Sequence, residues 1–181
     1  MQEDFLINSD SRPTTQILES DLRWREQTES DILFALELFI LHRWNEMSLI
    51  PTITDEQRYL LLYQQALLQQ RYYKDMNPMS EMLIIEHLEN RVGRLYIDRH
   101  TNMNWHIIDI CLLPAVCGQG IGTTLIKKLI NKADHAGSPC SLYVRNDNPA
   151  QRLYHRLGFR TLPSSALELD LFLVRPMTVC M

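Results

Sequence analysis

Three closely spaced glycines form the strongest chemical signal in the 181-residue sequence. Gly118, Gly120 and Gly122 lie in the run AVCGQGIG, directly after an apolar stretch that ends at Pro114. The first backbone N–H groups of a helix lack intrahelical acceptors and lie at the positive end of its dipole, so a turn of this kind can hold an anion. Glycine lets a phosphate approach the backbone and permits a positive φ angle. A diphosphate is the expected ligand.

Two other glycine-rich phosphate sites fit this run poorly. A P-loop requires Lys and then Ser or Thr after its last glycine, whereas Gly122 is followed by Thr123 and Thr124, and the next lysine is Lys127. A dinucleotide fingerprint opens the first strand–helix–strand unit and is followed by an acidic residue at the end of the next strand, and neither condition is met. A glycine turn that serves packing alone remains an alternative.

A second cluster, NPAQRLYHRLGF, runs from Asn148 to Phe159. Asn148 can cap a short helix, Pro149 suits its first turn, and Gly158 can end it in the left-handed conformation. Tyr154 lies on the apolar face of this helix. On periodicity alone it is either a half-buried aromatic residue or a proton donor, and both interpretations stay open.

The elements that must position these clusters follow from periodicity. A capping signal at Thr28 predicts a helix to about Trp44, and another at Thr54 predicts a helix towards Tyr72. Alternation predicts strands over 22–26, 82–87, 92–98, 105–113, 141–145 and 167–174. The 105–113 strand is apolar on both faces, which is typical of a central strand. Helices are expected after the glycine turn, with six inward residues, and over 148–157; the six are Ile121, Leu125, Ile126, Leu129, Ile130 and Ala133.

Length and composition predict one α/β (α+β) domain over residues 20–181, preceded by a flexible N-terminal arm over residues 1–19. The net charge of −4 and the pI near 5.8 disfavour nucleic acid or an anionic membrane as partners. The longest apolar run, from Ile32 to Leu41, is interrupted by Glu37, so no membrane span is expected. The four cysteines form no CxxC pair, which disfavours a metal site or a disulfide framework and favours a cytoplasmic location.

The run IIDICLLPAVCGQGIGTTLIKKL, followed by LYV and then by NPAQRLYHRLGF, resembles the GNAT N-acetyltransferase superfamily. Both blocks match in content, order and separation. The resemblance extends over residues 21–175 in element order and rests on motifs between residues 105 and 160. It implies a mixed, mostly antiparallel central β-sheet with helices on both faces, and acetyl-CoA as the co-substrate, without a metal.

The resemblance also implies a cofactor site. In this family the pyrophosphate of CoA lies on backbone amides of the glycine turn, and the pantetheine arm adds to the end of the central strand, where Asn148 would hydrogen-bond it and Ala150 would line it. Tyr154 would protonate the CoA sulfur, after direct attack by an amine and formation of a tetrahedral intermediate stabilised by a backbone amide near Leu112. The cofactor-binding residues so implied are Leu112, Leu113, Cys117, Gly118, Gln119, Gly120, Ile121, Gly122, Thr123, Asn148, Ala150 and Tyr154.

Cys117 departs from the family pattern, which usually has Arg or Gln at this position. One side-chain contribution to the phosphate site is therefore missing, so we expect weaker CoA binding without loss of activity. A reactive thiol at a helix N-terminus is the alternative interpretation of this cysteine.

Two residues of the central strand are candidates for the base that must accept a proton from the amine. His106 lies where some members of the family carry a glutamate base, and Asp109 lies in an apolar stretch. On a regular strand the two would face opposite sides, so at most one is expected to reach the acceptor. A surface histidine and a structural aspartate are the alternatives.

The acceptor is expected to be a primary amine of a small molecule or a peptide. In this fold the acceptor site is usually bordered by the first two helices and their connection, here His42 to Ile53, where Arg43, Trp44 and Glu46 could bind it or could form a solvated helix end. A non-catalytic acyl-CoA-binding or regulatory module of the same fold is the runner-up, and an interaction domain that binds no nucleotide is a third reading. The oligomeric state stays open, with a homodimer as one candidate.

Overall fold

One mixed sheet of seven strands organises the chain. The computed structural model describes residues 18–47, 50, 52–101, 103–163 and 169–178. The strand order is β1-β2-β3-β4-β5-β7-β6, and all neighbours are antiparallel except β4 and β5, which are parallel. The strands are β1 (Leu22–Glu26), β2 (Glu81–His87), β3 (Asn90–Asp98), β4 (Trp105–Leu112), β5 (Cys140–Arg145), β6 (Arg160–Thr161) and β7 (Asp170–Arg175). The predicted fold class is confirmed.

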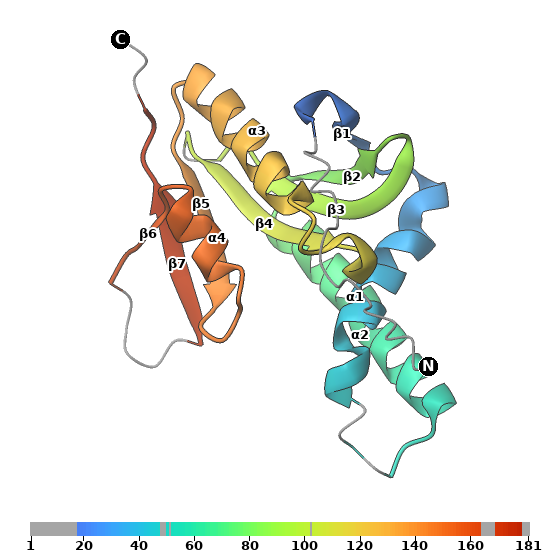
Figure 1. Cartoon of the computed structure of the whole chain (residues 1–181). Coiled ribbons are helices and arrows are strands. Elements are labelled where there is room, and N and C mark those ends of the chain that lie inside the picture. Colours follow the sequence, from blue (N-terminus) through green and yellow to red (C-terminus); the bar gives the residue numbers. More distant parts are fainter. Residues whose placement is uncertain (1–17, 48–49, 51, 102, 164–168, 179–181) are drawn as a thin grey trace, which may run out of the picture.

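Helices cover both faces of this sheet (Figure 1): α3 lies on one face, with α4 packed into the same core, and α1 and α2 lie on the other. They are α1 (Ile32–Met47), α2 (Asp55–Met76), α3 (Ile121–His135) and α4 (Gln151–Arg156), with short 3-10 turns at Glu19–Asp21, Glu29–Asp31 and Pro114–Val116. Among the described residues no helix is long and apolar enough to cross a membrane.

Both helix starts predicted from capping signals are present. Thr28 and Asp31 form a capping box ahead of α1, and Thr54 and Gln57 form one at the start of α2. Each box satisfies two backbone donors that the first turn leaves without partners. Helix α1 runs three residues past the expected end at Trp44.

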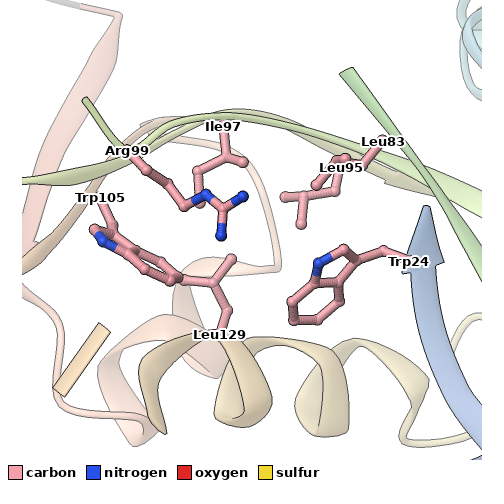
Figure 2. Close-up of a pocket in the computed structure, with 7 residues that line it drawn as sticks. All are labelled: Trp24, Leu83, Leu95, Ile97, Arg99, Trp105 and Leu129. Carbon is pink, nitrogen blue, oxygen red and sulfur yellow. The ribbon is translucent and has the colours of Figure 1, made fainter. Parts of the chain in front are cut away.

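Helix α3 and the sheet enclose the main core. All six residues predicted to face inward are buried, because an apolar stripe at helical spacing has to be covered. Figure 2 shows this layer near the start of β4, where Leu129 of α3 points towards the sheet between Trp24 of β1 and Trp105 of β4. The guanidinium of Arg99 lies over the Trp105 ring, 5.0 Å from its centroid. The stem of a charged side chain thus helps to close the core at its rim.

Two parts of the sheet differ from the sequence expectations. The predicted strands 82–87 and 92–98 left the four residues 88–91 for a turn, whereas the turn between β2 and β3 consists of Leu88 and Glu89 alone. Both have positive φ angles, because a two-residue turn of this hand fits the twist of the strands. Strand β6 was not predicted, and β7 begins at Asp170. The first residues of the predicted 167–174 strand, 167 and 168, lie outside the described residues, as do residues 1–17 of the predicted arm.

Candidate active site

A β-bulge in β4 sets the geometry of the site. Tyr96 of β3 is opposite Asp109, whereas the next residue, Ile97, is opposite Ile107, so Ile108 is the additional residue on β4. A bulge bends its strand and increases the local twist. In the described residues β4 pairs with β5 only from residue 105 to residue 107. The two strands begin side by side and then separate (Figure 1).

The bulge changes which side chains share a face. Trp105 and Ile107 belong to the core under α3, and after the bulge Ile110 packs against that same core. His106 and Asp109 therefore both face the α1 and α2 side of the sheet. The prediction that they face opposite sides was wrong, because the inserted residue shifts the alternation by one.

The separated part of β4 turns backbone groups towards β5. The Leu113 N–H donates to the Val92 carbonyl of β3 over 2.8 Å, so the Leu112 carbonyl, on the other side of the same peptide plane, points away from β3. Alternate residues of an antiparallel pair behave alike, so Ile110 also turns its N–H and C=O towards β5. We call the Ile110 and Leu112 backbone groups the open edge.

The open edge has one side-chain contact that the sequence did not suggest. His42, near the end of α1, places Nε2 2.6 Å from the Leu112 carbonyl oxygen. The end of α1 thus reaches the point where β4 and β5 separate.

The glycine turn follows directly after the open edge. Gly118 and Gly120 have φ angles of 79° and 91°, and nothing lies within 4 Å of where a Cβ would stand on either. Thr124 N–H is bonded to the Gly120 carbonyl over 3.0 Å, so the N–H groups of Ile121 and Gly122 precede the first intrahelical donor of α3. The turn offers free donors on an open side, which is what an anion such as a diphosphate requires.

Helix α4 closes the site from the β5 side. A Cβ on Gly122 would stand 3.6 Å from Leu112 and 3.8 Å from Leu153, so the end of β4, the first turn of α3 and α4 meet there. Arg156 reaches Thr123 over 3.5 Å. Tyr154 is buried, with its ring edge against Phe159.

A charge on β4 influences the pKa of Tyr154. Burial and then the negative charge of Asp109 raise the pKa of Tyr154 to about 12, so its hydroxyl is protonated at neutral pH. A phenol in this state can donate a proton.

Asp109 is the counter-ion of a buried arginine. The Arg94 Nε donates to Asp109 over 2.7 Å, and its other nitrogens donate to the Ala35 carbonyl and to Gln69. Only 3% of the Arg94 side chain is exposed. Asp109 thus neutralises a cation that would otherwise be uncompensated in the interior.

His106 lies in the paired part of β4. Its Nδ1 is 2.8 Å from the Ser141 hydroxyl, which also accepts a hydrogen bond from Asn104. Burial lowers the pKa of His106, against an opposing effect of Asp98, and so favours the neutral imidazole. The ring lies edge-on to Tyr143, with 5.7 Å between the centroids.

The three predicted acceptor residues lie in the last turns of α1, within the helix. Arg43 is paired with Glu46 over 2.9 Å, whereas Trp44 stacks on Arg58 of α2 at 5.0 Å. The structure brings Arg43 and Glu46 together but directs Trp44 to the other helix. Of the connection between α1 and α2, residues 48, 49 and 51 lie outside the described residues.

Two further predicted cofactor residues have structural contacts. Asn148 accepts a hydrogen bond from the Ala150 N–H over 2.9 Å in the turn that precedes α4. The predicted helix over 148–157 is shorter in the structure: α4 begins at Gln151 and its N-cap residue is Ala150, so Asn148 stabilises the turn and does not cap the helix. Burial raises the pKa of the Cys117 thiol, and its sulfur donates to the Leu113 carbonyl at 3.4 Å. The thiol is therefore not activated, which argues against the reactive-cysteine interpretation.

Among the described residues, no group of three or more His, Cys, Asp or Glu side chains is placed to hold a metal ion. The expectation that the chain uses no metal stays a prediction.

Comparisons with known proteins agree with this geometry. Residues 49–180 match the family model described as an acetyltransferase (GNAT) domain. No curated protein matches the chain in sequence.

Among solved structures, the chain is similar to the PaiA N-acetyltransferase of Thermoplasma acidophilum in complex with coenzyme A, with a TM-score of 0.61, 17% identity, and coverage of 86% of this chain and 98% of that one. It is also similar to the ribosomal-protein-S18-alanine N-acetyltransferase of Escherichia coli, with a TM-score of 0.56, 15% identity, and coverage of 88% of this chain and 96% of that one. YncA of Salmonella typhimurium with its cofactor acetyl-CoA gives a TM-score of 0.51, 19% identity and coverage of 87% and 95%. At these identities the likeness concerns the fold.

Proposed function

This chain belongs to the GNAT acetyltransferase family, and from that premise we propose that it transfers the acetyl group of acetyl-CoA to a primary amine of a small molecule or a peptide. The observation that carries the proposal is the separation of β4 from β5 after residue 107, directly next to the glycine turn. It combines backbone groups that can align an extended ligand with donors that can hold its phosphates. Two of the similar proteins are named as N-acetyltransferases, which supports an amine as the acceptor.

The residues of the site fit acetyl-CoA. The positive φ angles of Gly118 and Gly120 and the open space beside both glycines leave the backbone accessible to a diphosphate. The arm of the ligand would lie along the open edge at Leu112, and Asn148 and Ala150 would border it. Leu113, also expected at this site, lies outside the open edge because its N–H is bonded to Val92. Bound acetyl-CoA would supply the thioester that the amine attacks.

Tyr154 is the general acid in this proposal. Its raised pKa keeps the hydroxyl protonated at neutral pH, so that it can donate a hydrogen bond, and then its proton, to the sulfur as the C–S bond breaks. A backbone N–H of the open edge would stabilise the negative oxygen of the tetrahedral intermediate. The positions of Ile110 and Leu112 make their amides the candidates.

The remaining expectations stay proposals. Residues 20–181 act as one domain behind the arm at residues 1–19, the protein acts in the cytoplasm without nucleic acid or membrane, and a homodimer remains a candidate. Cys111, Cys117 and Cys140 are free thiols, in keeping with a reducing compartment.

The proposal is tested first by calorimetric titration with acetyl-CoA, with dephospho-CoA and NAD as controls. Release of free thiol is then measured with a peptide that starts with alanine, with free lysine and with 1,4-diaminobutane, and the acetylated product is identified by mass spectrometry. Saturable binding with transfer to any of these amines supports an enzyme. Binding without transfer favours the non-catalytic module, and no binding at millimolar acetyl-CoA refutes the proposed function.

A further inference from the structure

The contact between His42 and Leu112 defines the protonation of the imidazole. A carbonyl oxygen can only accept a hydrogen bond, so the proton of this contact is on Nε2, which lies 2.6 Å from the Leu112 oxygen. When His42 is neutral, its lone pair is therefore on Nδ1. A carbonyl that fixes the tautomer in this way prepares the other ring nitrogen to accept a proton.

The position of His42 relative to the reacting centre follows from the strand. The Leu112 carbonyl belongs to the open edge, and the Ile110 N–H lies two residues back on the same edge, about 6.6 Å away at the usual rise of a strand. Suppose that the thioester carbonyl is held by the N–H of Ile110 or by that of Leu112. An amine that attacks this carbonyl then comes within reach of His42, directly or through one water molecule.

Resting on the proposed function, we propose that His42 accepts the proton that the acceptor amine must lose. The acceptor enters as an ammonium ion and loses one proton to become nucleophilic. The C–N bond then forms, the nitrogen releases its second proton to water, the C–S bond breaks, and the leaving thiolate takes its proton from Tyr154, which regains one from solvent. One proton is released in total. His42 is exposed, so Nδ1 can take a proton from the amine and pass it to water.

The two candidates on β4 are less free to do this. Asp109 is held by the buried Arg94, and its charge is needed there. His106 lies in the paired part of β4, with Nδ1 occupied by the Ser141 hydroxyl. Within the described part of the chain, His42 is the titratable side chain that hydrogen-bonds the open edge itself.

The charged and titratable groups around the end of α1 come from α1 itself and from four other elements of the fold. Arg43 and Glu46 follow His42 on α1 and interact electrostatically with Asp147 and Arg145, which lie beyond and at the end of β5. The others are Asp109 and Cys111 on β4, Tyr73 and Arg58 on α2, and Arg94 on β3. Because these groups carry charges of both signs, several of them could shape the dependence of kcat on pH. The contribution of His42 is therefore measured with a variant that changes His42 alone.

His42→Gln is the deciding variant, because the glutamine amide can still donate to the Leu112 carbonyl but cannot accept the proton. The matched control is His135→Gln: His135 makes the same kind of contact, from Nδ1 to the Asn131 carbonyl over 2.6 Å, but at the far end of α3. We expect His42→Gln to lower kcat at pH 7 by about 100-fold, the low end of general-base contributions. The loss should shrink towards pH 10, where an α-amine is neutral without help and a much larger fraction of a lysine-type amine is neutral than at pH 7. Acetyl-CoA affinity and the control should be unchanged.

The inference is overturned if His42→Gln keeps kcat within about threefold of wild type at pH 7, or if lost acetyl-CoA affinity accounts for the whole defect. Either result leaves the proposed function intact, because the wild-type enzyme is assayed beside the variants with acetyl-CoA and the same three amines. If the wild type itself transfers no acetyl group, the proposed function fails instead, and the inference with it.

Discussion

Replacement of Asp109 by asparagine should destabilise the protein strongly while leaving its chemistry intact. The substitution keeps the size of the side chain but removes the charge that neutralises Arg94, whose side chain is 3% exposed. Breaking a buried ion pair from one side costs about 3–5 kcal/mol, because the remaining charge is left uncompensated. The Asp109 side chain is 19% exposed, and the Arg94 bonds to Ala35 and Gln69 remain, so the lower limit applies.

A loss of about 3 kcal/mol corresponds to a decrease of about 6–12 °C in Tm for a chain of this size. Urea unfolding followed by circular dichroism gives the free energy of unfolding, and a thermal scan gives Tm. The matched control is Asp147→Asn, whose ion pair with Arg145 is exposed and should contribute nothing measurable. The double variant with Arg94→Met should recover stability relative to Asp109→Asn, because it removes the uncompensated charge.

The same variant separates the structural role of Asp109 from a catalytic one. At 15 °C, where the variant remains folded, kcat should stay within a few-fold of wild type. The reasoning is refuted if Asp109→Asn unfolds within about 1 kcal/mol of wild type, since Arg94 would then not depend on that charge. A 100-fold loss of kcat in a stable variant would instead identify Asp109 as the base.

Three further predictions follow from the site and its support. Tyr154→Phe should lower kcat by at least about 100-fold without a change in the dissociation constant of acetyl-CoA, measured by calorimetry, and equal turnover would exclude the acid role. Gly120→Val should weaken acetyl-CoA binding at least about tenfold in the same titration, because a side chain would stand over the donors at a φ of 91°, and retained affinity would count against the diphosphate site. The pKa of Asp31 is held well below its usual value, first by Arg25, so its stabilising effect is present above pH 4 and is lost as the pH falls through the folded-state pKa. Urea unfolding at pH 7 and pH 3 should therefore show a smaller pH dependence for Asp31→Asn than for wild type, and an equal dependence would contradict this assignment.

Local patterns were sufficient where a single element determines its own structure. The inward face of α3 and the capping boxes at Thr28 and Thr54 follow from residue spacing within one or two turns, and all were predicted from the sequence. The glycine turn could also be predicted from the sequence, because only a few residue types tolerate its φ angles.

Features that depend on contacts between distant segments left no such pattern. Ile108 is as apolar as its neighbours, so nothing in the sequence of β4 marks it as the inserted residue. Arg94 resembles any charged residue of a strand until α1 and α2 cover it. His42 reaches Leu112 across seventy residues, and β6 is too short to show alternation.

The separation of β4 from β5 has a consequence for amide hydrogen exchange. Along a strand that is paired on one side only, protected and exchangeable amides must alternate, because successive N–H groups point in opposite directions. Leu113, bonded to Val92, should exchange slowly with deuterium, whereas Leu112 and Ile110 should exchange quickly. Fast and slow exchange should therefore alternate from residue to residue along the end of β4, and this alternation should stop at Ile107, where pairing with β5 begins. A bound extended ligand that hydrogen-bonds this edge would slow exchange at Ile110 and Leu112 and so remove the alternation.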